Sequence, residues 1–231
     1  ERRKLPTIRA GAHAVLERDG LILLWRGPGE PDYDIPAVPA GMVHRGDHDA
    51  GVVRMHLQEF AENSVDFQHF APLHGQMRLP WLGLPIPGVT IRHQARWEPD
   101  EERSWIARFH DSAMLRFRGK DLPWSAAEAT ITFHGPGSVV HFRFQIPEVG
   151  EILMIQSHAP LAPLAQHVRF RWFADRSIPR LLVSYVVGNW ISQWREDIAI
   201  WENKIFRERP QLVRDDGPIH ALRKWYRQFQ G

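Results

Sequence analysis

The chain has 231 residues, which fits one large domain or two small ones, and its 29 basic and 27 acidic residues argue against a nucleic-acid-binding protein. It contains neither an apolar run of transmembrane length nor a basic-then-apolar leader, so we expect a cytoplasmic protein without a transmembrane segment. The absence of cysteine excludes disulfides, cysteine nucleophiles and a cysteine-held iron–sulfur cluster from this sequence, while the 13 histidines direct attention to histidine chemistry.

The N-terminal part of the chain predicts a hairpin, a loop, a strand and a helix. An Asp-Gly turn between two apolar runs predicts the β-hairpin over residues 12–25. Residues 27–39 are rich in Pro, Gly and Asp and predict a loop, 52–57 predict a strand, and 59–70 have helical spacing. The Pro-rich, apolar residues 79–87 cannot form a regular helix, and we expect them to cover a hydrophobic space.

The rest of the chain predicts an antiparallel sheet followed by helices. Segments of strand length recur between turn-forming residues and span 91–97, 104–110, 113–117, 129–134, 138–145, 152–158 and 167–173. A 3-4-3-4 apolar spacing predicts a long helix over 181–206, with Ile191, Trp194, Ile198, Trp201 and Ile205 in its stripe, and 219–229 predict a short closing helix. This order indicates an α+β fold, in which a curved antiparallel sheet wraps a long helix and leaves a cavity between the layers.

One polar motif carries the clearest chemical signal. Asn63, Asp66, His69 and His74 form the pattern Asn-x2-Asp-x2-His-x4-His. Asp66 and His69 are three residues apart and share a helix face, whereas His69 and His74 would diverge by about 140° on a straight helix. Pro72 lies between the two histidines and cannot be accommodated in a regular helix interior. If the helix ends or kinks there, the two imidazoles converge, which predicts a metal site.

A carboxylate would complete such a site. Two neutral imidazoles suit Fe, Zn or Cu, and an added carboxylate gives the facial triad of non-haem iron. Asp66 is close enough in sequence to be a ligand or the partner of one, and the best remote candidate is Asp197, beside the apolar stripe of the long helix. Two other interpretations stay open, namely that the histidines are unrelated and that Asp197 is a boundary residue or pairs with an arginine. Glu62 and Glu196 are expected to be solvated or salt-bridged.

Two motifs together resemble a known family. The Asn63–His74 motif, with a later carboxylate on a long helix, resembles the catalytic domain of Rieske non-haem iron oxygenases. The C-terminal segments resemble the oxygenase component of 3-ketosteroid 9α-hydroxylase and the related cholesterol 7-desaturases; they are 197–204, Arg209-Pro210, 216–219 and 223–229. The opening hairpin matches the segment that leads out of the Rieske domain in this family.

The resemblance implies roles for five residues. It implies that His69, His74 and Asp197 are the ligands of a mononuclear Fe(II). It further implies that Asp66 bridges an iron-ligand histidine to a Rieske-cluster histidine of the neighbouring subunit in a homotrimer. Asn63 matches an asparagine near the iron.

The fold and function follow from the same resemblance. The implied fold is a helix-grip, START/Bet v 1-like α+β domain, a single iron domain over 1–231 with 1–50 as a lead-in and 51–231 as its core. The implied function is a terminal oxygenase that activates O₂ at Fe(II) to hydroxylate or desaturate a hydrophobic, steroid-like substrate. Electrons would come from NAD(P)H through a reductase or ferredoxin and a [2Fe-2S] cluster.

The missing cysteines leave three explanations for that cluster. It lies on a truncated or unordered part of the same protein, it lies on another chain, or it has been lost. Two other functions also stay open. A START-like cavity suits a binding module that carries a sterol or another apolar ligand without chemistry, and a metal-dependent hydrolase could use the same triad with Zn, although Asp66 would then have no role.

Overall fold

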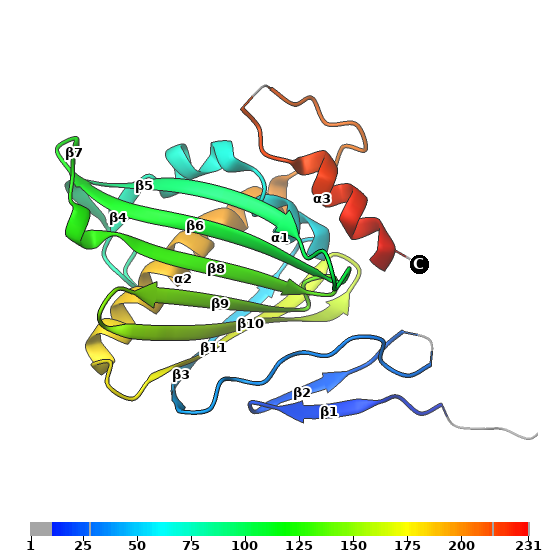
Figure 1. Ribbon diagram of the computed structural model, residues 1–231. Helices are drawn as coiled ribbons and strands as arrows, with labels where there is room; N and C mark the ends of the chain where they lie inside the picture. Colours follow the sequence, from blue (N-terminus) through cyan, green and yellow to red (C-terminus); the bar gives the residue numbers. More distant parts are fainter. Residues whose placement is uncertain (1–10, 28, 214, 231) are drawn as a thin grey trace, which may run out of the picture. The chain divides into compact units, whose positions relative to one another are not determined.

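The chain folds into two compact units that meet between Val38 and Pro39 in sequence (Figure 1). The computed structural model describes residues 11–27, 29–213 and 215–230. The first unit holds the predicted hairpin, β1 (Val15–Arg18) paired with β2 (Leu21–Leu24). Its two-residue turn has positive φ at both Asp19 (53°) and Gly20 (74°), which the twist of a tight hairpin requires.

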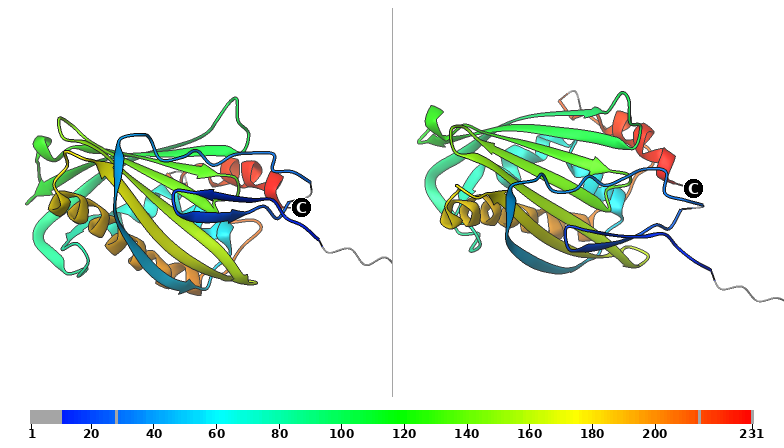
Figure 2. Two further views of the ribbon diagram at one scale, coloured as in Figure 1. Left: turned by 90° about the horizontal axis from the view of Figure 1, so that it is seen from below. Right: turned by 60° about the horizontal axis from the view of Figure 1, so that its bottom comes forward.

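The second unit is built on one antiparallel sheet with a long helix against it (Figure 2). Its strands run in the order β3-β11-β10-β9-β8-β6-β5-β4, with β7 beside β6. The strands are β3 (Met42–Val53), β4 (Gln76–Arg78), β5 (Pro85–Pro99), β6 (Ile106–Phe117), β7 (Lys120–Asp121), β8 (Ala127–His134), β9 (Val139–Ile146), β10 (Gly150–Ala162) and β11 (Ala165–Asp175). The α-helices are α1 (Leu57–Asn63), α2 (Arg180–Asn203) and α3 (Ile219–Tyr226). This is the α+β helix-grip fold expected from the sequence.

Aromatic side chains join α2 to the sheet. Phe142 on β9 lies 4.8 Å from Trp190, and Phe170 on β11 lies 5.1 Å from Trp194, measured between ring centroids. Burying each large apolar side chain contributes about 1.5–3 kcal/mol, so these contacts hold the helix on the sheet. The predicted stripe is confirmed at its buried positions, but the helix ends at Asn203. Ile205 therefore lies beyond it and is 72% exposed.

The strand predictions fail in two places. Residues 104–110 and 113–117, predicted as two strands, form the single strand β6. Residues 52–57, predicted as one strand, contain the end of β3 and the start of α1. β3 itself begins at Met42, inside the segment that the sequence assigned to a lead-in, and at the edge of the sheet it pairs only with β11 among the described strands.

The segment 79–84 covers α2 rather than a cavity. Trp81 places its indole against Gly188 of α2 and donates a hydrogen bond from Nε1 to the Ser184 hydroxyl at 3.0 Å. A Cβ at residue 188 would lie 2.4 Å from that indole, so the close approach requires glycine. The sequence predicted that this segment covers a hydrophobic space. Trp81 does pack against the core, whereas Leu82 is 71% exposed.

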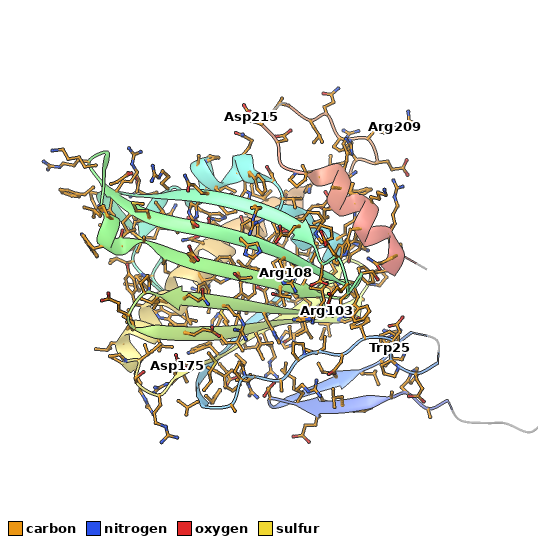
Figure 3. All side chains as sticks on the ribbon, viewed as in Figure 1. Trp25, Arg103, Arg108, Asp175, Arg209 and Asp215 are labelled. Carbon is orange, nitrogen blue, oxygen red and sulfur yellow. The ribbon has the colours of Figure 1, made fainter. Side chains whose placement is uncertain are left out.

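The β5–β6 connection is fixed by one carboxylate. Asp100 accepts hydrogen bonds from the main-chain amide of Arg103 at 2.8 Å and from the guanidinium of Arg108 at 2.5 Å; both arginines are labelled in Figure 3. These hydrogen bonds hold the pKa of Asp100 well below its usual range. The connection keeps β5 and β6 in register, and these strands carry His93 and Asp111 on their inner face.

A buried ion-pair cluster joins α1 to α3. Glu62 accepts hydrogen bonds from Arg223 at 2.7 Å (Nε) and 2.9 Å (Nη2), and Lys204 lies 3.5 Å away. Burial raises the pKa of Glu62, but the hydrogen bonds from Arg223 and Gln58 outweigh this, and the pKa lies below its ordinary value. The expectation that Glu62 is salt-bridged is confirmed.

Replacing Glu62 with glutamine is expected to lower the free energy of unfolding by about 2 kcal/mol at neutral pH, because Arg223 loses its counter-charge. A lowered pKa means that this stabilisation is complete above the unfolded-state pKa, ordinarily 4.5, and is lost as the pH falls through the folded-state pKa. Urea unfolding of the two proteins should differ most at neutral pH, and the difference should disappear as the pH falls through the lowered folded-state pKa of Glu62. The exposed Glu101→Gln is the control, and an equal Glu62→Gln difference in acid and at neutral pH would contradict the ion-pair interpretation.

None of the helices among the described residues combines the length and the apolarity needed to cross a membrane.

Candidate metal centre

The polar motif lies where α1 ends. The helix predicted over 59–70 stops after Asn63, and the chain continues through a 3₁₀ turn (Phe67–His69) and a π-helical turn (Phe70–His74). In a π-helix the hydrogen bond joins residues five apart, so residues at this spacing lie closer to one face than they do in an α-helix. The two imidazoles of His69 and His74 therefore converge, with ring centroids 5.0 Å apart.

Asp197 reaches the same point from α2. It is 5% exposed, and its Oδ1 lies 3.1 Å from Nε2 of His74. One potential ligand atom from each of His69, His74 and Asp197 lies within 4.8 Å of the others. The fold thus brings together the two segments that the sequence singled out, which are separated by more than half of the chain.

Asn63 connects two of the three groups. Its side-chain amide donates a hydrogen bond to Oδ2 of Asp197 at 3.2 Å, and the same nitrogen lies 3.4 Å from Nε2 of His69. Asn63 therefore positions the carboxylate from the last turn of α1. One carboxylate oxygen of Asp197, Oδ2, accepts the hydrogen bond from this amide, while the other, Oδ1, lies next to His74.

The orientation of His69 is set by the main chain. Its Nδ1 contacts the carbonyl oxygen of Asp66, to which it donates, so Nε2 carries the lone pair and lies next to the Asn63 amide nitrogen. Burial lowers the pKa of His69, as does nearby His74, although Asp197 acts in the opposite direction. A neutral imidazole is the form that binds metals. The structure shows this contact from the Asp66 carbonyl, and the predicted contact of the Asp66 carboxylate with a ligand histidine stays a prediction.

A second carboxylate lies behind His74. Oε2 of Glu196 is 3.7 Å from Nδ1 of His74, and its other oxygen pairs with Arg78. Such a carboxylate on the far side of a ligand histidine orients the ring and raises its basicity. From the sequence, Glu196 was expected only to be solvated or salt-bridged. Its position next to Asp197 was the one signal that could have indicated a role at the metal centre.

The three side chains fit a bound cation. Oδ1 of Asp197 is buried and makes no hydrogen bond, and it lies 3.1 Å from Nε2 of His74, a nitrogen that would face the same ion. A buried carboxylate oxygen is costly unless another group compensates it. Two imidazoles and one carboxylate are the donor set of mononuclear non-haem Fe(II) sites, with positions left open for O₂ and substrate. The donor chemistry and the uncompensated carboxylate oxygen both fit such an ion.

A small cavity adjoins the three side chains. It has a volume of about 50 Å³ and also contains His93 and Asp111 in its wall. Its remaining wall is mainly aromatic and includes Phe60, Phe70, Phe109, Phe133, Phe142 and Trp190. The candidate metal centre therefore faces an apolar space between α2 and the sheet.

Comparison with known proteins supplies the family. The model of the 3-ketosteroid 9alpha-hydroxylase C-terminal domain matches residues 26–230. The chain belongs to this family. Membership confirms the resemblance inferred from the two sequence motifs.

Relatives of this 3-ketosteroid 9alpha-hydroxylase C-terminal domain include steroid-acting enzymes by name. Cholesterol 7-desaturase of Caenorhabditis elegans is 31% identical over 93% of the chain and 53% of the relative. The oxygenase component of a 3-ketosteroid-9-alpha-monooxygenase from Rhodococcus rhodochrous is 23% identical over 98% of the chain and 61% of the relative. The chain thus spans roughly half of the length of the curated relatives that it matches.

Solved structures share the fold of this domain at low sequence identity. The NdmA QL mutant of Pseudomonas putida CBB5, determined with caffeine, has a TM-score of 0.61 at 16% identity, covering 93% of the chain and 60% of that protein. Dicamba monooxygenase bound to 3,6-dichlorosalicylic acid has a TM-score of 0.58 at 16% identity, covering 94% and 69%. These likenesses support the helix-grip architecture.

Proposed function

We propose that the chain is the catalytic domain of a Rieske-type non-haem iron monooxygenase that hydroxylates or desaturates a steroid-like substrate. The observation that carries the proposal is the buried convergence of His69, His74 and Asp197 beside an apolar cavity, in a chain of the 3-ketosteroid 9alpha-hydroxylase family. Both hydroxylases and desaturases of steroids are among the named relatives.

In this proposal the three side chains hold one Fe(II), and bound iron supplies the activation of O₂. The chain's own residues prepare the site. Asn63 and the Asp66 carbonyl fix the orientations of Asp197 and His69 before the metal binds. The aromatic wall excludes water, which limits side reactions of an activated centre.

The electrons would come from outside this sequence. Without cysteine the chain cannot hold a [2Fe-2S] cluster, so we propose that the cluster belongs to another part of a longer protein or to another chain. A reductase or ferredoxin would supply it from NAD(P)H in the cytoplasm. The proposal includes a homotrimer in which Asp66 bridges an iron-ligand histidine to the cluster of the neighbouring subunit.

A steroid must enlarge the cavity to enter it. Sites for ligands of that size measure about 300–1,000 Å³, and this cavity measures about 50 Å³. Movement of aromatic side chains in its wall is therefore part of the proposal. A binding module without chemistry would need the same enlargement, but it gives no reason to gather one potential ligand atom from each of His69, His74 and Asp197 within 4.8 Å of one another.

The proposed function is tested by reconstitution. The chain loaded with Fe(II), and supplied with a Rieske protein, a reductase and NADH, is expected to convert cholesterol or a 3-ketosteroid to a hydroxylated or desaturated product. Mass spectrometry under ¹⁸O₂ distinguishes the two products by label incorporation. The control without the Rieske protein should give no sustained turnover. Turnover in that control, or an iron-loaded system that transforms neither steroid, would contradict the proposal.

A further inference from the structure

A buried histidine–aspartate pair lies in the cavity wall, apart from the three proposed iron ligands. Nδ1 of His93 on β5 lies 2.7 Å from Oδ2 of Asp111 on β6, and their side chains are 8% and 6% exposed. Both line the cavity that contains His69, His74 and Asp197. In the strand register His93 is opposite Ala113, so His93 and Asp111 are diagonal neighbours on the inner face of the sheet.

The pair is incompletely satisfied. Nε2 of His93 and Oδ1 of Asp111 are buried and have no hydrogen-bond partner in the described structure. Two well-packed apolar residues at these positions would usually stabilise the fold as well as this buried polar pair does. The fold therefore gives no reason for a polar pair here, whereas a ligand that pairs with Nε2 would.

Phe70 contacts both the pair and the candidate metal centre. Its ring centroid lies 5.1 Å from that of His93, 4.3 Å from that of His69 and 5.9 Å from that of His74. The cavity wall consequently contains a metal-binding group and, next to the same phenyl ring, one polar pair. A mainly apolar molecule with one polar substituent matches that arrangement.

We propose that His93, positioned by Asp111, binds a hydroxyl group of an otherwise apolar substrate and selects for alcohols; this rests on the proposed steroid function. In the tautomer that donates from Nδ1 to Asp111, Nε2 carries a lone pair and accepts a hydrogen bond from the hydroxyl. A ketone has no proton to donate and a hydrocarbon has no polar group, so both leave Nε2 unpaired at a cost.

Equilibrium binding to the iron-loaded chain tests the assignment with three probes: cholesterol, cholest-4-en-3-one and cholest-5-ene, each delivered in cyclodextrin. Wild type is expected to bind cholesterol about tenfold more tightly than either of the others, the effect of one buried hydrogen bond. The double variant His93→Leu/Asp111→Leu, which removes both polar side chains together, should bind all three with similar affinity.

The matched control is His110→Leu. His110 is the neighbour of Asp111 on β6, but it faces the other side of the sheet and lies 3.3 Å from Glu98. The His110→Leu variant should keep the tenfold preference for cholesterol. Thermal unfolding checks that the double variant is folded. If that variant does not fold, His93→Leu/Asp111→Asn, which keeps a polar group at residue 111, takes its place.

The possible outcomes separate this assignment from the proposed function. Wild type that binds the three probes equally, or prefers the ketone, overturns the role of His93 and leaves the steroid substrate in place. A folded double variant that keeps the preference for cholesterol does the same. Failure of wild type to bind any of the three contradicts the steroid substrate and this assignment together.

Discussion

Replacing His69, His74 or Asp197 with alanine is expected to abolish iron binding. Each change removes one of three donors, and the two that remain cannot hold Fe(II) against water in a site of this kind. Wild type reconstituted with Fe(II) under anaerobic conditions should retain about one ion per chain after desalting, and each variant less than about a tenth of that. Metal analysis by mass spectrometry measures the ratio directly, without a need for turnover.

Two further variants sharpen this result. His44→Ala removes a half-exposed histidine that pairs with Asp47 on the surface, and it should keep the full iron content. Asn63→Ala removes the amide that orients Asp197 but no proposed ligand, so it should weaken the affinity for iron by about 10–100-fold. Equal iron in wild type and in the three ligand variants would refute the assignment.

Thermal unfolding gives a second measurement of the same site. An ion that binds only the folded chain stabilises it by about 2.7 kcal/mol at a hundredfold excess over the dissociation constant. Fe(II) should therefore raise the unfolding temperature of wild type and of His44→Ala. It should leave the unfolding temperature of the three ligand variants unchanged, because their dissociation constant for Fe(II) exceeds the working concentration.

The long helix and most of the sheet could be predicted because their apolar residues follow the period of each structure. Ile191, Trp194 and Trp201 lie on one face of α2 at helical spacing, and all three are buried. β3 gave no such pattern. Its sequence contains three charged residues, two histidines and two glycines, because an edge strand buries little of its surface.

Gly46 shows why β3 could not be found from periodicity. A Cβ at this residue would lie 2.5 Å from the indole of Trp172 on the neighbouring strand. The glycine is thus required by a partner 126 positions later in the sequence, and no local rule reveals that. A register shift lies beside Trp172, and it further interrupts the alternation of side chains along β3.

The candidate metal centre was predictable in its residues but not in its geometry. The spacing of His69 and His74 indicated convergence, and the structure achieves it with a π-helical turn that contains Pro72 instead of a kink in an α-helix. Glu196 and His93 were missed because their significance depends on contacts between distant segments. Neither has a local spacing that distinguishes it from a surface charge or from an unassigned histidine.

Asp66→Ala is expected to keep its iron and to lose turnover with physiological electron donors. Iron is retained because His69 contacts the main-chain carbonyl of Asp66, which alanine preserves. Turnover is lost because the proposed bridge to the neighbouring cluster needs the carboxylate. We expect a turnover rate at least about 100-fold below that of wild type. This is the upper end of the loss seen when one group that supports a metal ligand is removed.

The test is made on the protein with its cluster supplied, in the same polypeptide or by a partner. Iron content, cluster reduction by the reductase, and product formation in a single turnover are measured separately. Asp66→Ala should match wild type in the first two and fail in the third, while Asp47→Ala, a surface acid paired with Arg171 at 2.5 Å, should match wild type in all three. A variant that loses its iron would show that the carboxylate supports the metal site itself. Product formed at the wild-type rate would show that electrons reach the iron by a route that does not involve Asp66.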